Sequence, residues 1–197
     1  MLLGLTAVVI GYFLGSIPLA YIIARLRKGI DIRNCGVGNV GAVNIFRHVG
    51  NWEGFIVAFT DIAKGAVAIL IAQALDVSQI WLLGAGFSAI LGHNFPIFIG
   101  FKGGKGSATV IGIFLMLVPI EIGITLGIIA ILILIFRNMA FAVCIGFVFM
   151  PILIWLLEGS IVLVFYSLAI LMFIGVRSLP HAKQAWPKTR KNKNAIK

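Results

Sequence analysis

Seven apolar runs, separated by short polar gaps, constrain this chain more than any other feature. They cover residues 2–24, 55–75, 80–99, 107–119, 122–136, 139–157 and 161–176. An α-helix needs about 20 apolar residues to cross a hydrocarbon core of ~30 Å. We therefore expect an all-α polytopic membrane protein with about seven transmembrane helices, and five or six as the alternative. Because the fourth and fifth runs are short, we expect re-entrant or broken helices there.

Composition supports this interpretation. Of the 197 residues, 61% are hydrophobic and 11% are charged, against roughly 45–50% and about 25% in soluble domains. An ordinary soluble globule, a disordered chain, a coiled coil and a disulfide-rich secreted module are excluded. The first run lacks the positive n-region of a cleaved signal peptide, so we expect it to be retained. Residues 1–197 are expected to form one membrane domain, which ends in a basic cytoplasmic tail over 177–197.

Lysine and arginine are confined almost entirely to alternate gaps. Of 16 such residues, 15 follow the first, third or fifth run or lie in the tail, whereas the other gaps contain Asp76, Glu121 and Glu158 and no cation. Because cytoplasmic loops are rich in Lys and Arg, the N-terminus is predicted outside and the C-terminus in the cytoplasm. Glu121 and Glu158 are taken to mark outer turns. The formal charge of +10 then favours membrane lipids or an anionic substrate over nucleic acid.

Two predicted cytoplasmic loops, residues 29–54 and 91–109, are rich in Gly, Asn, Lys and Arg. Glycines allow several backbone N–H groups to converge on one anion, while cations and amides add further donors. We predict a phosphate-binding site where the loops meet, with flexible turns as the alternative. The candidate residues are the cations Arg47, Lys102 and Lys105, the glycines Gly38, Gly41, Gly103, Gly104 and Gly106, and the amides Asn39, Asn44 and Asn94.

Other motifs in these loops carry less weight. Gly36, Gly38 and Gly41 satisfy G-x-G-x-x-G, but a dinucleotide-binding motif requires a preceding strand, and here a membrane helix precedes it. The GGKGS segment lacks the glycine spacing of a nucleotide P-loop. Cys35 and Cys144 match no metal-site spacing, and we expect reduced thiols, with Cys144 in the core. No metal or cofactor is predicted.

Several polar residues lie inside or beside the apolar runs. Asp61 and Lys64 are three residues apart on one helix face, which favours a structural ion pair over a role for Lys64 near the anion. His93, at the end of the third run, is a candidate general base or a packing residue. Ser16 and Pro18 interrupt the first run, which predicts a kink, and Ser16 is a candidate substrate contact.

Three blocks of sequence carry a resemblance to a known family. GSIP at 15–18 precedes GIDIR at 29–33 and the glycine-rich stretch that ends at Arg47, and LGHNFP at 91–96 precedes FKGGKG at 101–106. On these motifs the chain resembles the bacterial acyl-phosphate:glycerol-3-phosphate acyltransferases, and the resemblance extends over residues 15–136. The resemblance implies a seven-helix enzyme of the bacterial inner membrane with its active site facing the cytoplasm.

The same resemblance implies a reaction. A fatty acyl group would pass from acyl phosphate to the sn-1 hydroxyl of glycerol 3-phosphate, giving lysophosphatidic acid and phosphate for phospholipid synthesis. Lys105, Lys102, Arg47 and His93 would be the catalytic residues, and Arg177 would join the substrate-binding set. No cofactor is implied, and a monomer is the default expectation.

The chain departs from the family pattern at three places: the first loop, the tail, and residues 138–141, where a family serine is replaced. The family loop usually reads S-G-N-x-G-A-T-N, and here Val37 and Val43 replace the two hydroxyl residues. Each lost hydrogen bond to a charged phosphate costs roughly 1.5–3 kcal/mol. A non-catalytic or altered-acceptor paralogue and a phosphate-ester transporter are therefore the alternatives. Pro180, shortly after Arg177, is expected to disturb the last helix.

Overall fold

The computed structural model describes the backbone of residues 1–185 and the side chains of residues 1–178 other than Ala140. Over these residues the chain forms ten α-helices, two 3-10 turns and no strand. They are α1 (Leu2–Ser16), α2 (Leu19–Lys28), η1 (Ile32–Asn34), α3 (Ala42–His48), α4 (Asn51–Ala74), α5 (Gln79–Asn94), η2 (Ile97–Ile99), α6 (Ser107–Leu117), α7 (Pro119–Phe136), α8 (Met139–Val148), α9 (Met150–Leu157) and α10 (Ile161–Ala185). The rest of the predicted basic tail, residues 186–197, lies outside the described residues.

The predicted all-α membrane class is confirmed. Five segments are long and apolar enough to cross a membrane: Leu2–Lys28, Asn51–Ala74, Gln79–Ile99, Pro119–Phe136 and Ile161–Ser178. Two apolar helical segments are shorter, Ser107–Leu117 and Phe141–Leu157. With its 11 residues, α6 is about 16 Å long at 1.5 Å per residue. The count of seven crossings and the orientation therefore stay predictions.

In the second half of the chain, the helix breaks differ from those that the sequence suggested. The fifth run forms one continuous helix, α7, so the predicted break there is wrong. The sixth run is the divided one, between α8 and α9, because Pro151 in the first turn of α9 has no N–H to continue the preceding helix. The disturbance predicted at Pro180 is also wrong, since α10 extends to Ala185. Membrane helices tolerate proline where neighbouring groups or water satisfy the freed carbonyl.

The first run is divided at Pro18 into α1 and α2, as the sequence predicts. The α1 helix packs so closely on α5 that a side chain at Gly11 or Gly15 would collide with the backbone carbonyls of Ala85 and Ala89. Small residues of this kind let two membrane helices approach closely. The contact brings the end of α1 beside the C-terminal end of α5.

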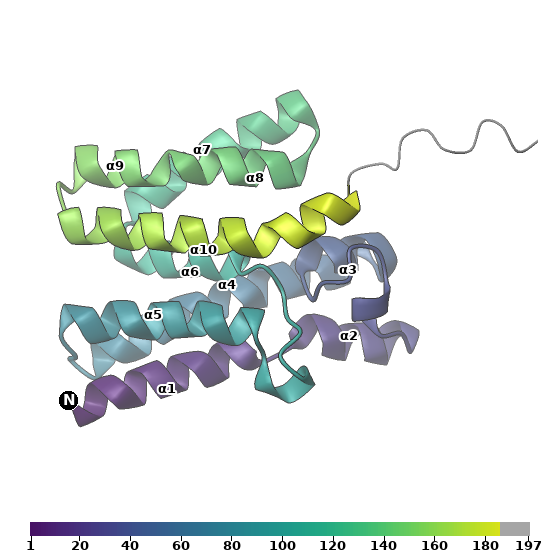
Figure 1. The fold of residues 1–197 in the computed structure, drawn as a ribbon, viewed down its shortest axis with the longest axis horizontal. Helices are drawn as coiled ribbons and strands as arrows, with labels where there is room; N and C mark the ends of the chain where they lie inside the picture. Colours follow the sequence, from purple (N-terminus) through teal and green to yellow (C-terminus); the bar gives the residue numbers. More distant parts are fainter. Residues whose placement is uncertain (186–197) are drawn as a thin grey trace, which may run out of the picture.

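Figure 1 shows how the connections are distributed along the bundle. The N-terminus of α1 lies at one end, on the left of the view. The connections that follow α2 and α5, together with the end of α10, gather at the opposite end. Both glycine-rich loops therefore share one end of the molecule, as the charge pattern predicts.

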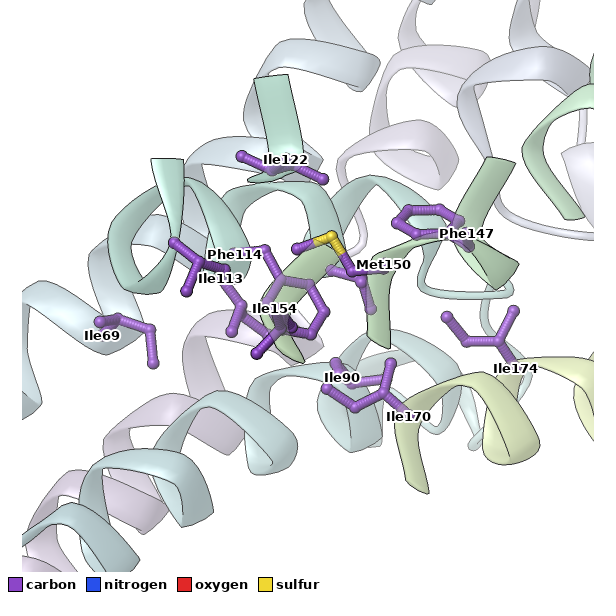
Figure 2. Close-up of a cluster of buried hydrophobic side chains, with 12 residues drawn as sticks. Ile69, Ile90, Ile113, Phe114, Ile122, Phe147, Met150, Ile154, Ile170 and Ile174 are labelled. Atoms are coloured by element: carbon purple, nitrogen blue, oxygen red, sulfur yellow. The ribbon is translucent and has the colours of Figure 1, made fainter. Parts of the chain in front are cut away.

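The largest apolar core joins α6 to α9 and α10. Its buried members include Phe114 on α6, Met150 and Ile154 on α9, and Ile170 on α10. Figure 2 shows the side chains of Phe114, Met150 and Ile154 together in this cluster. This core fixes the position of α6, whose N-terminus follows the second loop, and of α10, which carries Arg177.

Two residues differ in burial from their sequence-based interpretation. Glu121 lies next to the turn between α6 and α7, but its side chain is only 1% exposed. Cys144 is exposed on α8 and not in the core, although both cysteines are free thiols. Side chains that face lipid are as apolar as those that face the interior, so apolarity alone does not separate the two positions.

Candidate anion-binding site

The first loop, residues 29–41, is held by side chains that bind its own backbone. Asp31 accepts hydrogen bonds from the backbone and the guanidinium of Arg33, and forms a 2.6 Å ion pair with it. The hydrogen-bonded guanidinium lowers the pKa of Asp31 to about 2. The buried Asn44 side chain faces three carbonyl oxygens of this region at 3.0–3.1 Å. These hydrogen bonds from its own side chains therefore hold the backbone of the first loop in place.

The second loop, residues 95–106, folds back onto the end of α5. The N–H groups of Gly103 and Gly104 donate hydrogen bonds of 3.2 and 3.1 Å to the last two carbonyl oxygens of α5. A side chain at Gly103 or Gly104 would collide with His93, and Gly106 has a φ of +89°, which L side chains rarely adopt. Close packing against α5 therefore requires glycine at these positions.

The two loops touch each other. The backbone N–H of Val40 donates a hydrogen bond to the carbonyl oxygen of Gly103 at 3.5 Å. The Arg33 guanidinium donates a shorter one, of 2.8 Å, to the carbonyl oxygen of Ile99. These contacts join segments that are more than sixty residues apart in the chain. Donors from both loops are thus placed in one region.

A cluster of buried charged groups lies between α4 and α5 near the loops. Lys64 Nζ lies 2.8 Å from Asp61 Oδ1, and His93 Nδ1 lies 3.5 Å from the same oxygen. Asp61 and His93 are only 4% and 6% exposed. Charges at such depth are stable only when they are paired. The cluster therefore connects α4 to the end of α5.

A small pocket opens beside this cluster, at the break between α1 and α2. Residues of both loops and of the helix ends line it, with Asp61, Lys64 and His93 as its charged or titratable members. The lining residues are Gly15, Ile17, Pro18, Leu19, Ala20, Val40, Asp61, Lys64, His93, Pro96 and Gly103.

The N-terminus of α6 offers a second set of donors. Its first backbone N–H groups have no partner within the helix, and a helix N-terminus carries partial positive charge. Asn94 is 0% exposed, and neither atom of its amide finds a partner among the described residues. Lys105 is half-buried next to this N-terminus, and burial lowers the pKa of its ammonium group. This arrangement suits a phosphate group.

The remaining predicted cations surround the loops. Arg177, on α10, donates a hydrogen bond of 3.3 Å to the Asn94 carbonyl oxygen and lies over the Phe95 ring at 4.6 Å. Its Nε is buried and has no partner in the described part of the chain. Arg47 and Lys102 are exposed, on α3 and in the second loop. Among residues 1–178 neither side chain makes an ion pair, so both are free to meet an anion.

Two predicted substrate contacts, Ser16 and Asn44, are fully buried. Ser16 does not line the pocket itself, but its neighbours Gly15 and Ile17 do, and its buried hydroxyl has no hydrogen-bond partner among the described residues. The side-chain N–H groups of Asn44 are occupied by backbone carbonyls, so this residue organises the loop. Sequence reasoning also missed the joining role of Arg33. The D-x-R spacing with Asp31 is a signal only for the ion pair within the first loop, and nothing local in the sequence signals the contact with Ile99.

The helix bundle and its two joined cationic loops define an integral membrane protein with a candidate anion-binding site at one end. The family model described as Glycerol-3-phosphate acyltransferase matches residues 5–184. The chain belongs to the glycerol-3-phosphate acyltransferase family and is a membrane acyltransferase.

Relatives and solved structures agree with this assignment. Glycerol-3-phosphate acyltransferase 1 of Dehalococcoides mccartyi is 39% identical over 178 residues, which cover 87% of this chain and 85% of the relative. Glycerol-3-phosphate acyltransferase of Parasynechococcus marenigrum is 38% identical, over 85% of this chain and 79% of the relative. The crystal structure of PlsY (YgiH) in its glycerol 3-phosphate form superposes with a TM-score of 0.85 at 32% identity, covering 92% of this chain and 90% of that one. Its lysophosphatidic acid form gives 0.83 at 31% identity.

Proposed function

We propose that this acyltransferase moves a fatty acyl group from acyl phosphate to the sn-1 hydroxyl of glycerol 3-phosphate. The products are lysophosphatidic acid and inorganic phosphate. The observation that carries the proposal is the contact between the two loops at Val40 and Gly103, because it places cations and backbone donors from both around one region. Both substrates are phosphorylated, and their phosphate groups repel each other. A site whose cations neutralise both groups reduces this repulsion.

The candidate residues form two sets, and each set suits one of the two phosphate groups. Lys105, Asn94 and the N-terminus of α6 with Gly106 suit one phosphate, since they combine a cation with neutral donors in a half-buried setting. The first loop, with Gly38, Asn39 and Gly41, and the exposed cations Arg47 and Lys102 suit the other phosphate. Arg177 closes the site from α10.

Acyl phosphate is already activated, so positioning supplies most of the catalysis. The glycerol hydroxyl oxygen attacks the acyl carbonyl carbon, and the new C–O ester bond forms as the bond between that carbon and the phosphate oxygen breaks. Backbone N–H groups near Gly103–Gly106 stabilise the developing oxyanion. The hydroxyl proton passes to an oxygen of the phosphate group of the acyl phosphate. This phosphate group then leaves as inorganic phosphate.

We place the site on the cytoplasmic face of the bacterial inner membrane. The support is the gathering of both cationic loops at one end of the bundle (Figure 1), because cytoplasmic loops are enriched in Lys and Arg. Phosphorylated substrates made in the cytoplasm then reach the loops directly, while the acyl chain stays among the apolar helices.

The second candidate function is acyl transfer to an acceptor other than glycerol 3-phosphate. Val37 and Val43 stand in the first loop region where the family's usual pattern has hydroxyl side chains. Fewer donors for the acceptor's phosphate favour an acceptor with a smaller anionic charge or another shape. Neutral glycerol and dihydroxyacetone phosphate are suitable competing acceptors for the assay.

The test is phosphate release from palmitoyl phosphate by purified full-length protein in detergent, with and without glycerol 3-phosphate. We expect release that requires the acceptor and yields lysophosphatidic acid. Lys105→Ala and Arg47→Ala are expected to lower kcat/KM at least about tenfold, since hydrogen bonds to charged groups are worth about 1.5–3 kcal/mol. Glu158→Gln, at the opposite end of the molecule, is the matched control. Unchanged rates in both cation variants would refute the charge assignment.

A further inference from the structure

The cationic end of α2 lies beside the start of α4. Arg27 Nε lies 3.1 Å from Glu53 Oε1, and this ion pair joins the two helices. Among the described residues, nothing accepts a hydrogen bond from the two terminal amino groups of Arg27, and Lys28 makes no ion pair. Arg25 differs, because its guanidinium pairs with Asp31. Within the described structure, Arg27 and Lys28 are therefore the cations of α2 whose donors can meet an anion from outside the chain.

An exposed aromatic face continues along α4 from these cations. Its members recur at spacings of three and four residues, so they share one side of the helix. They are Trp52, Phe55, Ile56 and Phe59, and each is exposed. Glu53, the partner of Arg27, lies at the edge of this face, one residue after Trp52. The cations Arg27 and Lys28 together with this face form one continuous region, which we call the α2–α4 surface.

Helix length places the two parts of this surface at different depths. The segment Leu2–Lys28 has 27 residues and is about 40 Å long at 1.5 Å per residue. A hydrocarbon core is ~30 Å thick. Charged residues avoid that core, so the excess length lies at the cationic end, which shares its end of the bundle with the two loops (Figure 1). Trp52 is 71% exposed at this end, and tryptophan is enriched at the level of the headgroups.

We propose that the α2–α4 surface is a binding site for one anionic phospholipid. The headgroup phosphate lies between Arg27 and Lys28, and an acyl chain lies along Phe55 and Phe59. Charge complementarity favours an anionic lipid, because a zwitterionic headgroup brings a cation of its own. Glu53 holds the Arg27 guanidinium in position before the lipid arrives, which lowers the entropy cost of binding.

This inference goes beyond the acyl transfer proposed above and does not depend on it. It does have a consequence for the first loop, which begins at Gly29, directly after Lys28. A lipid that binds the last turn of α2 also holds the residue from which this loop starts. The protein is therefore expected to be more stable in a membrane that contains anionic phospholipid.

Fluorescence quenching by brominated lipid tests the proposal. The full-length protein keeps Trp52 as its single tryptophan through Trp81→Phe, Trp155→Phe and Trp186→Phe. It is placed in vesicles with equal parts of phosphatidylglycerol and phosphatidylcholine, and only one of the two lipids carries bromine on its acyl chains. We expect a relative binding constant of at least about three in favour of phosphatidylglycerol, since one cation near an anionic headgroup is worth about fivefold in affinity. Equal quenching by the two lipids would overturn the proposal.

Trp155 provides the matched reporter. It is 56% exposed on α9, three residues before Glu158, and no cation lies near it in the sequence. A protein with Trp155 as its single tryptophan should be quenched equally by the two brominated lipids. The same preference at Trp155 as at Trp52 would overturn the proposal, because it would describe the whole membrane-facing surface and not a site.

Charge variants in the Trp52 protein locate the headgroup. Arg27→Gln and Lys28→Gln remove one charge each, and each should lower the preference at least about twofold, while the double variant should abolish it. Arg137→Gln is the matched control, because Arg137 is an exposed cation at the end of α7. It should leave the preference unchanged. An equal fall in Arg137→Gln and Arg27→Gln would contradict a local site.

Thermal unfolding in detergent gives a readout that needs no turnover. Added phosphatidylglycerol should raise the Tm of the wild type more than phosphatidylcholine does, since a ligand of the folded state stabilises it. The Arg27→Gln, Lys28→Gln double variant should lose this difference, and an undiminished difference would overturn the proposal. Without phosphatidylglycerol the double variant should keep the kcat/KM of the wild type, and a loss there would place these cations in the substrate site instead. A wild type that prefers phosphatidylglycerol but transfers no acyl group would refute the proposed reaction and leave the lipid site standing.

Discussion

The guanidinium of Arg33 donates a hydrogen bond of 2.8 Å to the carbonyl oxygen of Ile99 while it forms an ion pair of 2.6 Å with Asp31. One side chain thus binds a carboxylate in the first loop and a backbone carbonyl of the second. A planar guanidinium offers several donors in a fixed arrangement, so it can satisfy both partners at once. The relative position of the two loops depends on this residue.

Arg33→Lys is expected to weaken the connection, because one ammonium group on a flexible stem does not reproduce both contacts. Losing a hydrogen bond to a charged group costs about 1.5–3 kcal/mol, so we expect a fall of roughly ten- to a hundredfold in kcat/KM. Arg27→Ala is the control: its ion pair with Glu53 involves a guanidinium that is 64% exposed, and exposed pairs contribute little. Equal activity of Arg33→Lys and wild type would show that the loops hold together without this bridge.

The depressed pKa of Asp31 predicts an acid sensitivity with a defined direction. The Arg33 guanidinium lowers this pKa to about 2 from its ordinary value of 3.8, so the folded state binds this proton less readily than the unfolded state does. The stabilisation is therefore fully present above about pH 4 and is lost as the pH falls toward 2. Asp31→Asn should lower Tm at pH 6, and the difference from wild type should vanish near pH 2.

Thermal unfolding in detergent at several pH values measures this effect. Glu158→Gln is the matched control, because Glu158 is exposed at the end of α9 and makes no ion pair among the described residues. Its Tm difference from wild type should stay small at every pH. A constant difference for Asp31→Asn across the same range would contradict the role of the ionised carboxylate.

The sequence was a good guide to the membrane class and to the loops, because each has a local signal. Apolar runs mark the helices, and glycine with cations marks the places where the backbone must turn around an anion. The Asp61 to Lys64 spacing likewise indicates one helix face, and the side chains lie 2.8 Å apart. These inferences need only the helical period and the cost of burying charge.

The inferences that failed needed long-range information. Apolar runs do not say which helix face meets lipid, so the sequence placed Cys144 in the core although it is exposed, and it did not predict the burial of Glu121. Hydrogen bonds between backbone carbonyls and distant side chains leave no local pattern. The contacts of Arg33 with Ile99 and of Tyr12 with Phe95 are of this kind. They appear only when the helices have been packed.

The half-buried Lys105 predicts a pH limit on anion binding. Burial lowers the pKa of its ammonium group below the usual 10.5, so the cation is lost at a lower pH than for an exposed lysine. Affinity for inorganic phosphate, measured between pH 7 and 10, should fall on the alkaline side. Lys105→Arg should move this fall to higher pH, because a guanidinium stays charged. Lys28→Arg, at the exposed end of α2, should leave the profile unchanged; the same shift there would contradict the assignment.

The packing of α4 on α6 depends on Gly112. A methyl group at this position would collide with the backbone carbonyl of Ile62, and backbone cannot rotate away as a side chain can. Overpacking of this kind costs typically 1–3 kcal/mol. Gly112→Ala should therefore lower Tm, although alanine favours helix by about 1 kcal/mol. Gly127→Ala on α7 is the control, because nothing lies within 4 Å of a methyl group there. It should leave Tm unchanged or raise it.

The number of membrane crossings can be tested by finding on which side of the membrane three turns lie. In a background without Cys35 and Cys144, single cysteines at Lys28, Ser78 and Glu158 report the ends of α2, α4 and α9. Lys28 lies at the cationic end of the molecule, so Lys28→Cys should react with a membrane-impermeant maleimide only in permeabilised cells. Ser78→Cys should react in intact cells.

Glu158→Cys decides whether the short α6 helix completes a crossing. Four apolar segments separate Ser78 from Glu158: α5, α6, α7 and the α8–α9 pair. If all four cross, the two cysteines lie on the same side and both react in intact cells. If α6, at about 16 Å, enters and returns without crossing, only three crossings remain and Glu158→Cys reacts only after permeabilisation. The first result supports seven crossings, and the second supports six with α6 as a re-entrant segment.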